Sequence, residues 1–186
     1  MVTIGALWLP ILLSAVAVWA ASAVIWTVMP HHKSDWGKLP DEDAARRALT
    51  PQGLVPGQYS IPYAVAHKDL QDPEITRKFE EGPVGILTVV PSGVPTMGSK
   101  IILSVVFYFV ITIVVAYLVS RTLDPGAEYL AVFRVTGTVA WLAYGTATVP
   151  DAIWFGRPWS GIAKGLGDAL VFGLLTAGFF GWLWPA

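Results

Sequence analysis

Residues 165–184, GLGDALVFGLLTAGFFGWLW, carry the pattern that decides the fold of this chain. Small residues recur at every fourth position, at Gly165, Ala169, Gly173, Ala177 and Gly181. Residues four apart lie on one face of a helix, so these five form a narrow ridge among Leu, Val, Phe and Trp side chains. Gly and Ala are common in transmembrane helices generally, but regular spacing favours an interface at which two helix backbones approach closely in lipid. The stretch predicts a membrane-spanning helix that packs through this ridge.

The composition of the whole chain also indicates a membrane protein. Of its 186 residues, 54% are hydrophobic and 13% are charged, about half the charged fraction of a typical soluble domain. Without any Cys, the chain has no disulfide, thiolate metal site or Cys nucleophile. A net charge of −1 without a basic stripe gives no support for a nucleic-acid partner. The lipid bilayer is the partner that the composition favours.

Four apolar stretches are long enough to cross a bilayer, at 4–29, 101–121, 129–149 and 165–184. The first has a signal peptide as its rival interpretation, but no Lys or Arg precedes it and its apolar run is long. We therefore expect a retained helix. The predicted fold is an all-α membrane protein with four transmembrane helices, in which residues 150–164 form an interfacial loop rich in Trp and Pro.

Basic residues close to the predicted spans give an orientation. The side that carries the long loop after the first span holds Lys33, Lys38, Arg46, Arg47, Lys100, Arg157 and Lys164. The opposite side holds only Arg121, with Arg134 just inside the membrane. The excess of Lys and Arg on cytoplasmic loops then predicts a cytoplasmic long loop and periplasmic termini, in a bacterial inner membrane.

The long loop, 30–100, is predicted to be a small α/β region with two short helices and two short strands. Acids precede bases in 38–49, which favours a helix, and Asp72-Pro73 begins a second helix that ends before Gly82-Pro83. Residues 58–65 and 85–90 are rich in β-branched and aromatic residues and are predicted to pair as strands. Because so small a region has a marginal core, we expect it to lie against the membrane face or against a partner.

Two ionisable residues lie within the predicted spans and are candidate functional residues by default, Arg134 and Asp168. They are expected at different depths, so direct pairing is not predicted. Lys164 lies four residues before Asp168 and is its expected partner. Arg134 is expected to extend outward toward Glu128 or Asp124, which we favour over a role in conduction or binding.

His31 and His32 follow the first span and are weak candidates for metal ligands. Metal ligands usually occur at spacings of three or four on a helix, or as separated pairs, whereas adjacent histidines are expected to point in different directions. A polar flank at the membrane interface is the favoured interpretation, and we predict no metal. The predicted spans contain no histidine, which excludes a haem held by histidines of facing helices, and no cofactor is predicted.

The chain resembles a family of small four-helix bacterial inner-membrane proteins of unassigned function. The resemblance rests on Pro30–Trp36 (PHHKSDW), Pro56–Tyr59 (PGQY), Gly82–Gly85 (GPVG), Tyr129–Arg134 (YLAVFR) and Thr176–Pro185 (TAGFFGWLWP). It covers nearly the whole length and implies the four-span topology and a bacterial source. It brings no catalytic residues.

These observations predict a non-catalytic accessory subunit of a larger membrane complex, of the respiratory or photosynthetic type. No phosphate-binding loop, nucleophile elbow or metalloprotease motif occurs, so no catalytic residue is predicted and the chain is not expected to be an enzyme. Other membrane-protein subunits are the expected partners, and a lipid or pigment bound at the interface stays open. The alternative is a small transporter or channel that uses Arg134 and Asp168, and a membrane-embedded enzyme is the third hypothesis.

Overall fold

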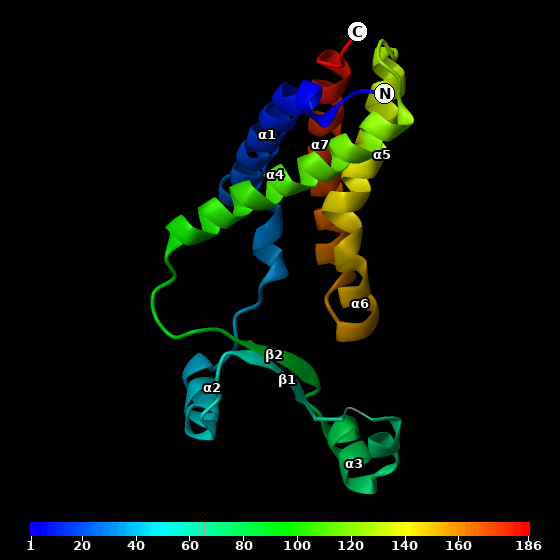
Figure 1. Ribbon diagram of the computed structural model, residues 1–186. Coiled ribbons are helices and arrows are strands. Elements are labelled where there is room, and N and C mark those ends of the chain that lie inside the picture. The colour runs from blue at the N-terminus through cyan, green and yellow to red at the C-terminus, as the bar shows by residue number, and fades with distance from the viewer. Residues whose placement is uncertain (65) are drawn as a thin grey trace. The chain divides into compact units, whose positions relative to one another are not determined.

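The computed structural model describes residues 1–64 and 66–186, and it is mostly helical with one two-stranded sheet (Figure 1). The chain divides into two compact units. One combines Met1–Trp36 with Thr96–Ala186, and the other is Gly37–Pro95. The first is called the helical unit below, and the second the loop unit.

The helical unit contains all of the long helices. Its elements are η1 (Ile4–Leu7), α1 (Trp8–Thr27), η2 (His31–Asp35), α4 (Met97–Thr122), α5 (Tyr129–Gly145), η5 (Thr146–Thr148), α6 (Val149–Phe155) and α7 (Trp159–Trp182), where η marks a 3₁₀ helix. Both chain termini lie at the same end of this unit as the connection between α4 and α5 (Figure 1). The Gly126 amide donates to the Pro185 carbonyl oxygen at 2.8 Å, and Trp184 Nε1 donates to the Asp124 carbonyl oxygen at 3.0 Å.

Three helices of this unit are long and apolar enough to cross a membrane, at Ile4–Thr27, Met97–Thr122 and Trp159–Trp182. The prediction of four spans is therefore confirmed only in part. Within the predicted third span, α5 has 17 residues, and the chain then tightens into η5 and continues as α6. Pro150 lies in the first turn of α6, where its missing N–H is tolerated. The predicted interfacial loop, 150–164, is therefore mostly helical, because it begins within α6 and its residues from Trp159 onward belong to α7.

Small residues hold α5 and α7 close together along most of their length. A methyl group added at Gly173 would lie 3.1 Å from the Gly137 carbonyl oxygen and 3.2 Å from the Trp141 amide nitrogen. A methyl group at Gly137 would lie 3.2 Å from the Ala177 side chain. Such distances leave no room for larger side chains, so the two backbones approach as the ridge predicts.

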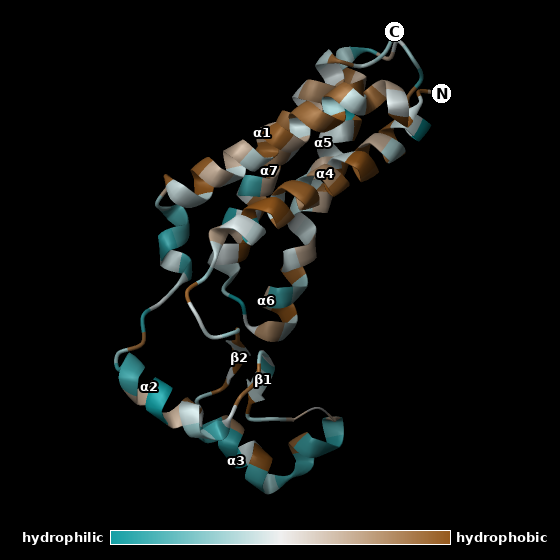
Figure 2. Ribbon diagram, turned by 60° about the vertical axis from the view of Figure 1, so that its left-hand side comes forward, coloured by the Kyte–Doolittle hydropathy of each residue, from teal (hydrophilic) through white to brown (hydrophobic). Residues whose placement is uncertain are grey.

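Most of the remaining surface of the helical unit is apolar. Figure 2 shows hydrophobic residues along the length of α4, and large side chains such as Ile102 (65% exposed) and Leu103 (67%) are mostly exposed. In water an apolar surface of this extent is rare on a monomer, whereas a bilayer solvates it without cost. The exposed apolar surface and the three long helices agree with a membrane protein.

The loop unit contains short elements only. These are α2 (Glu42–Leu49), η3 (Thr50–Gln52), β1 (Gly57–Ile61), η4 (His67–Gln71), α3 (Pro73–Glu81) and β2 (Gly85–Val89). The side chains of Asp41 and Asp72 accept hydrogen bonds from the first turns of α2 and α3, as helix N-caps do. Strands β1 and β2 pair antiparallel, with Tyr59 opposite Leu87, so the predicted two-stranded sheet is present. Its first strand ends at Ile61 and not at the predicted 65, which lies outside the described residues.

Candidate functional site

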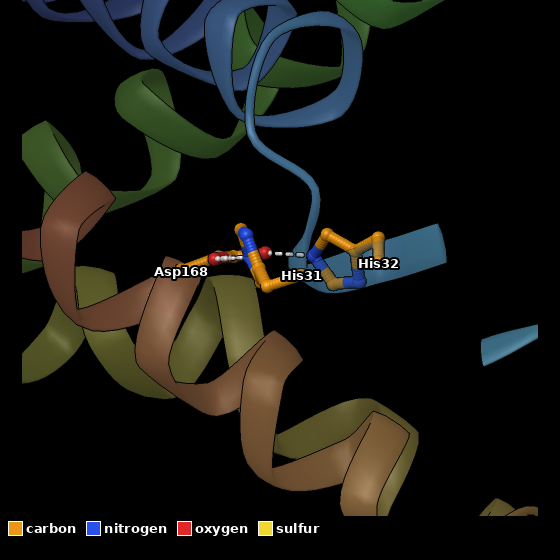
Figure 3. Close-up of side chains that lie close together, drawn as sticks. All are labelled: His31, His32 and Asp168. Atoms are coloured by element: carbon orange, nitrogen blue, oxygen red, sulfur yellow. Dashed lines mark hydrogen bonds and ion pairs between the residues drawn. The ribbon is translucent and has the colours of Figure 1, made fainter. Parts of the chain in front are cut away.

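A cluster of charged and polar side chains connects η2 to α7 within the helical unit. After α1 ends at Thr27, Pro30 leads the chain into η2, which carries His31, His32 and Asp35. Lys164 and Asp168 lie four residues apart on α7 and therefore on one face of that helix. Figure 3 shows the side chains of His31 and His32 directed at Asp168.

Asp168 lies at the centre of this cluster and contacts both histidines. One of its carboxylate oxygens, Oδ1, is 3.3 Å from His31 Nε2, and the other, Oδ2, is 2.6 Å from His32 Nε2. The Asp168 side chain is 13% exposed and the His32 side chain 7%. The carboxylate is therefore well shielded from solvent, and imidazole nitrogens face both of its oxygens.

Asp35 holds the opposite side of the His32 ring. Its Oδ2 lies 2.6 Å from His32 Nδ1, while its Oδ1 accepts a hydrogen bond of 2.6 Å from Lys164 Nζ. Lys164 also donates to Ser34 Oγ at 2.7 Å. These bonds join residues that are about 130 positions apart in the chain and fix η2 against the beginning of α7.

The ring of Trp26 covers one face of His32. Their centroids are 4.0 Å apart and their planes differ by 4°, which is a parallel stack. The His31 ring also lies close to that of His32, with centroids 4.2 Å apart and an angle of 41° between the planes. The last full turn of α1 and the first residues of η2 thus hold the His32 imidazole in one orientation.

The charges of the cluster shift two pKa values. Burial by itself would lower the pKa of His32, but the hydrogen bonds and negative charges of Asp35 and Asp168 outweigh it and raise that pKa above its ordinary value. The Lys164 ammonium, followed by His32, lowers the pKa of Asp35. Both shifts favour the charged forms of these two side chains.

Two expectations drawn from the sequence are wrong at this site. Lys164 was expected to pair with Asp168, one turn along the helix, but its ammonium bonds to Asp35 and Ser34 of η2. Adjacent histidines were expected to diverge, but both Nε2 atoms reach Asp168. The reason is the same in both cases: η2 lies directly against α7, so the tertiary contact replaces the local one.

The cluster contains the donor atoms of a potential metal site. One ligand atom from each of His31, His32 and Asp168 lies within 4.8 Å of the other two. The prediction that these histidines only flank the membrane interface was based on their adjacency, and the structure removes that argument.

The structure does not bring Arg134 into this cluster. Arg134 is exposed on α5 and lines an apolar groove of about 250 Å³ together with Trp141 and the α7 residues Leu170 and Leu174. Among the described residues, Arg134 forms no ion pair with Asp124, Glu128 or Asp168. The two ionisable residues singled out from the spans thus have unrelated surroundings.

Four of the five ridge positions contact α5. A methyl group added at Gly145 of α5 would lie 2.8 Å from the Ala169 side chain. Gly173 and Ala177 face Gly137, and a methyl group added at Gly181 would lie 2.8 Å from the Tyr129 ring. At Gly165 an added methyl group would meet open space among the residues that the structure describes. The ridge is therefore filled by a helix of the same chain, and it no longer argues for a partner subunit.

Sequence reasoning missed the contribution of Asp35 and Trp26 to the cluster. The spacing of His32 and Asp35, three residues apart, is compatible with one turn of a helix and was the only local signal. Trp26 is one of nine Trp residues in the chain, and nothing in the sequence distinguishes it from the others.

Comparison of the chain with family models, with curated proteins and with solved structures found no match.

Proposed function

We propose that the chain is a non-catalytic accessory subunit of a larger bacterial inner-membrane complex, and that its loop unit docks on a partner subunit. The helical unit anchors the chain in the bilayer, and Gly37–Pro95 provides the contact outside it. An energy-transducing complex, respiratory or photosynthetic, is the kind of host that we propose.

One observation carries this proposal: the loop unit has regular secondary structure but no core. None of its described residues is buried. Large apolar side chains are exposed on it, including Val55 (66%), Tyr63 (73%), Val84 (57%) and Ile86 (46%). A two-stranded hairpin alone is marginal in water, so a surface that covers these side chains would stabilise the unit.

The charge of the loop unit favours a protein over a lipid surface as that cover. Between residues 37 and 95 there are eight Asp and Glu against six Lys and Arg, a net charge of −2. The cytoplasmic leaflet is negatively charged and attracts basic segments, so it gives no electrostatic attraction to this unit. We therefore propose the extramembrane surface of another membrane-protein subunit as the partner.

The proposed topology has four spans with both termini periplasmic and the loop unit cytoplasmic. Two observations support counting α5 as a span: it packs along α7 through the close contacts at Gly137 and Gly173, and both termini lie at one end of the helical unit. The excess of Lys and Arg near the other end supports the orientation. We do not propose the transporter as a second function, because Arg134 and Asp168 contact different residues.

The proposal is tested by extracting native membranes with mild detergent and measuring the mass of the particle that contains this chain. We expect the chain to migrate with a complex much larger than itself. Ile86→Glu places a charge on the exposed apolar surface of the loop unit and should release the chain at its own mass. Gln52→Glu adds the same charge at an exposed polar residue of that unit and should leave the complex intact.

Two results would overturn the proposal. In the first, the wild-type chain migrates alone or as a small homo-oligomer after mild extraction. In the second, hydrogen exchange of the purified single chain shows strong protection of β1 and β2, which would mean that the chain itself already covers the loop unit.

A further inference from the structure

We infer that His31, His32 and Asp168 form a binding site for one divalent transition-metal ion of the zinc class. This inference is independent of the proposed function, because it concerns only the helical unit. It gives a role to three residues that the proposed function does not use.

The donor atoms and their separations suit such an ion. Two donors on a tetrahedral zinc ion, each at about 2.0–2.1 Å, lie roughly 3.3 Å apart, and His31 Nε2 is 3.3 Å from Asp168 Oδ1. The separation of His32 Nε2 from Asp168 Oδ2 is shorter, at 2.6 Å, so the carboxylate must turn slightly to admit the ion. The three side chains already converge, with one donor atom of each within 4.8 Å of the other two.

The surroundings of His32 match those of a metal-bound histidine. Such a histidine almost always donates a hydrogen bond from its second ring N–H to a carboxylate or carbonyl oxygen, which fixes the tautomer and makes the metal-binding nitrogen more basic. Asp35 occupies this position at 2.6 Å from Nδ1, leaving Nε2 for the ion. Asp35 is held in turn by Lys164, and Trp26 fixes the ring plane.

The position of Lys164 supports the same assignment. Four residues before Asp168 on α7, it has the spacing of a local ion pair, yet its ammonium bonds to Asp35 and Ser34. The Asp168 carboxylate is thereby left with imidazole nitrogens as its partners in the described chain. A carboxylate grouped with two imidazoles, and without a competing ammonium, can bind a cation.

The donor set also selects the class of ion. Two imidazole nitrogens and one carboxylate oxygen suit zinc and the neighbouring first-row ions, whereas Mg²⁺ and Ca²⁺ prefer oxygen ligands only. Three protein ligands leave at least one position for water or another small ligand. The His31 side chain is 31% exposed, which gives an ion access from solvent.

The test uses the full-length chain, purified in detergent micelles and treated with a chelator. Titration with Co²⁺ should produce visible absorption bands that saturate at one ion per chain and disappear when Zn²⁺ is added. His31→Gln removes the most exposed of the three ligands and should weaken Co²⁺ binding by more than about 100-fold. Asp35→Asn keeps all three ligands and should weaken it by about 10–100-fold, as the loss of a supporting carboxylate does.

The third histidine of the chain, His67 in the loop unit, provides the matched control. His67→Gln should bind Co²⁺ with the wild-type affinity. The thermal midpoint of His31→Gln in the presence of chelator checks that this variant is folded. If it is not, the wild-type protein still gives an answer, because Zn²⁺ that binds the native state must raise the thermal midpoint in a concentration-dependent way.

Three results would overturn the inference. They are the absence of saturable Co²⁺ bands in the wild type together with an unchanged midpoint in Zn²⁺, wild-type affinity in folded His31→Gln, and a loss of binding in His67→Gln as large as in His31→Gln. None of these results bears on whether the loop unit docks on a partner.

Discussion

In addition to its packing against α1, helix α7 makes two contacts of opposite physical character within the helical unit. Along its small-residue face it packs against α5, with backbone atoms of Gly137 and Trp141 just over 3 Å from a methyl group added at Gly173. Near its beginning it contacts η2 through Lys164 and Asp168, by hydrogen bonds and opposite charges. The first contact depends on the absence of side-chain volume, and the second on the presence of specific polar atoms.

This difference has consequences for how each contact fails. Added volume should break the contact with α5, because backbone atoms cannot move away from a new side chain. Removal of a charge should break the contact with η2, because the remaining partners are shielded from solvent and lose their hydrogen bonds. Substitutions of each type, placed on the same helix, therefore distinguish the two contacts.

The largest effect is expected from Gly173→Leu. Its methylene group would lie about 3 Å from the backbone of α5, and overpacking of this kind costs about 3 kcal/mol at the upper end of its usual range. The measurement is the free energy of unfolding in detergent micelles, with Gly165→Leu as the control because that ridge position has open space around it. Equal losses of unfolding free energy in the two variants would mean that the close approach of α5 and α7 at Gly173 does not cause the effect.

A smaller loss is expected from Asp168→Asn, measured with a chelator present. The substitution removes the negative charge that faces both histidines, and a hydrogen bond to a charged group contributes about 2 kcal/mol. Asp151→Asn is the matched control, since Asp151 forms only an exposed pair with Arg157 at 3.5 Å, and exposed pairs contribute little. If both substitutions are silent, the polar cluster does not hold η2 on α7.

A double-mutant cycle between Lys164 and Asp35 should show a smaller but definite coupling. The ammonium and the carboxylate are 2.6 Å apart, so Lys164→Met and Asp35→Asn should be non-additive in their effect on stability. The corresponding cycle between Lys164→Met and Asp168→Asn should show weaker coupling, because the structure contains no direct bond between them. Stronger coupling of Lys164 to Asp168 than to Asp35 would instead support the pair between Lys164 and Asp168 that the sequence spacing predicts.

The two contacts also differ in how far the sequence could predict them. The ridge was predictable, because the periodicity of Gly165, Ala169, Gly173, Ala177 and Gly181 is a local property of one helix. Its partner was not, since several helices could fill such a ridge. The polar cluster could not be predicted, because it depends on a contact between η2 and α7 across more than 120 intervening residues. A periodic pattern within one helix contains no information about such a contact. Local rules therefore favoured the pair Lys164–Asp168, which the structure does not contain.

The same limit explains the third predicted span. The apolar stretch 129–149 is long enough to suggest a span, but the helix geometry changes after Gly145, which a hydropathy average does not detect. By contrast, α2, α3 and the paired strands of the loop unit follow from caps, Gly and Pro, which act over a few residues.

The smallest effect is expected from Arg134→Gln. Arg134 lies on the exposed side of α5, outside both contacts of α7 and without an ion pair among the described residues. Substitutions at such positions usually change stability by less than about 0.5 kcal/mol, and membrane insertion should be unchanged. Asp168→Asn in the same measurement gives the scale for a residue that does belong to a contact. If Arg134→Gln destabilises the chain as strongly as Asp168→Asn, then Arg134 takes part in a contact of α5 that stabilises the fold.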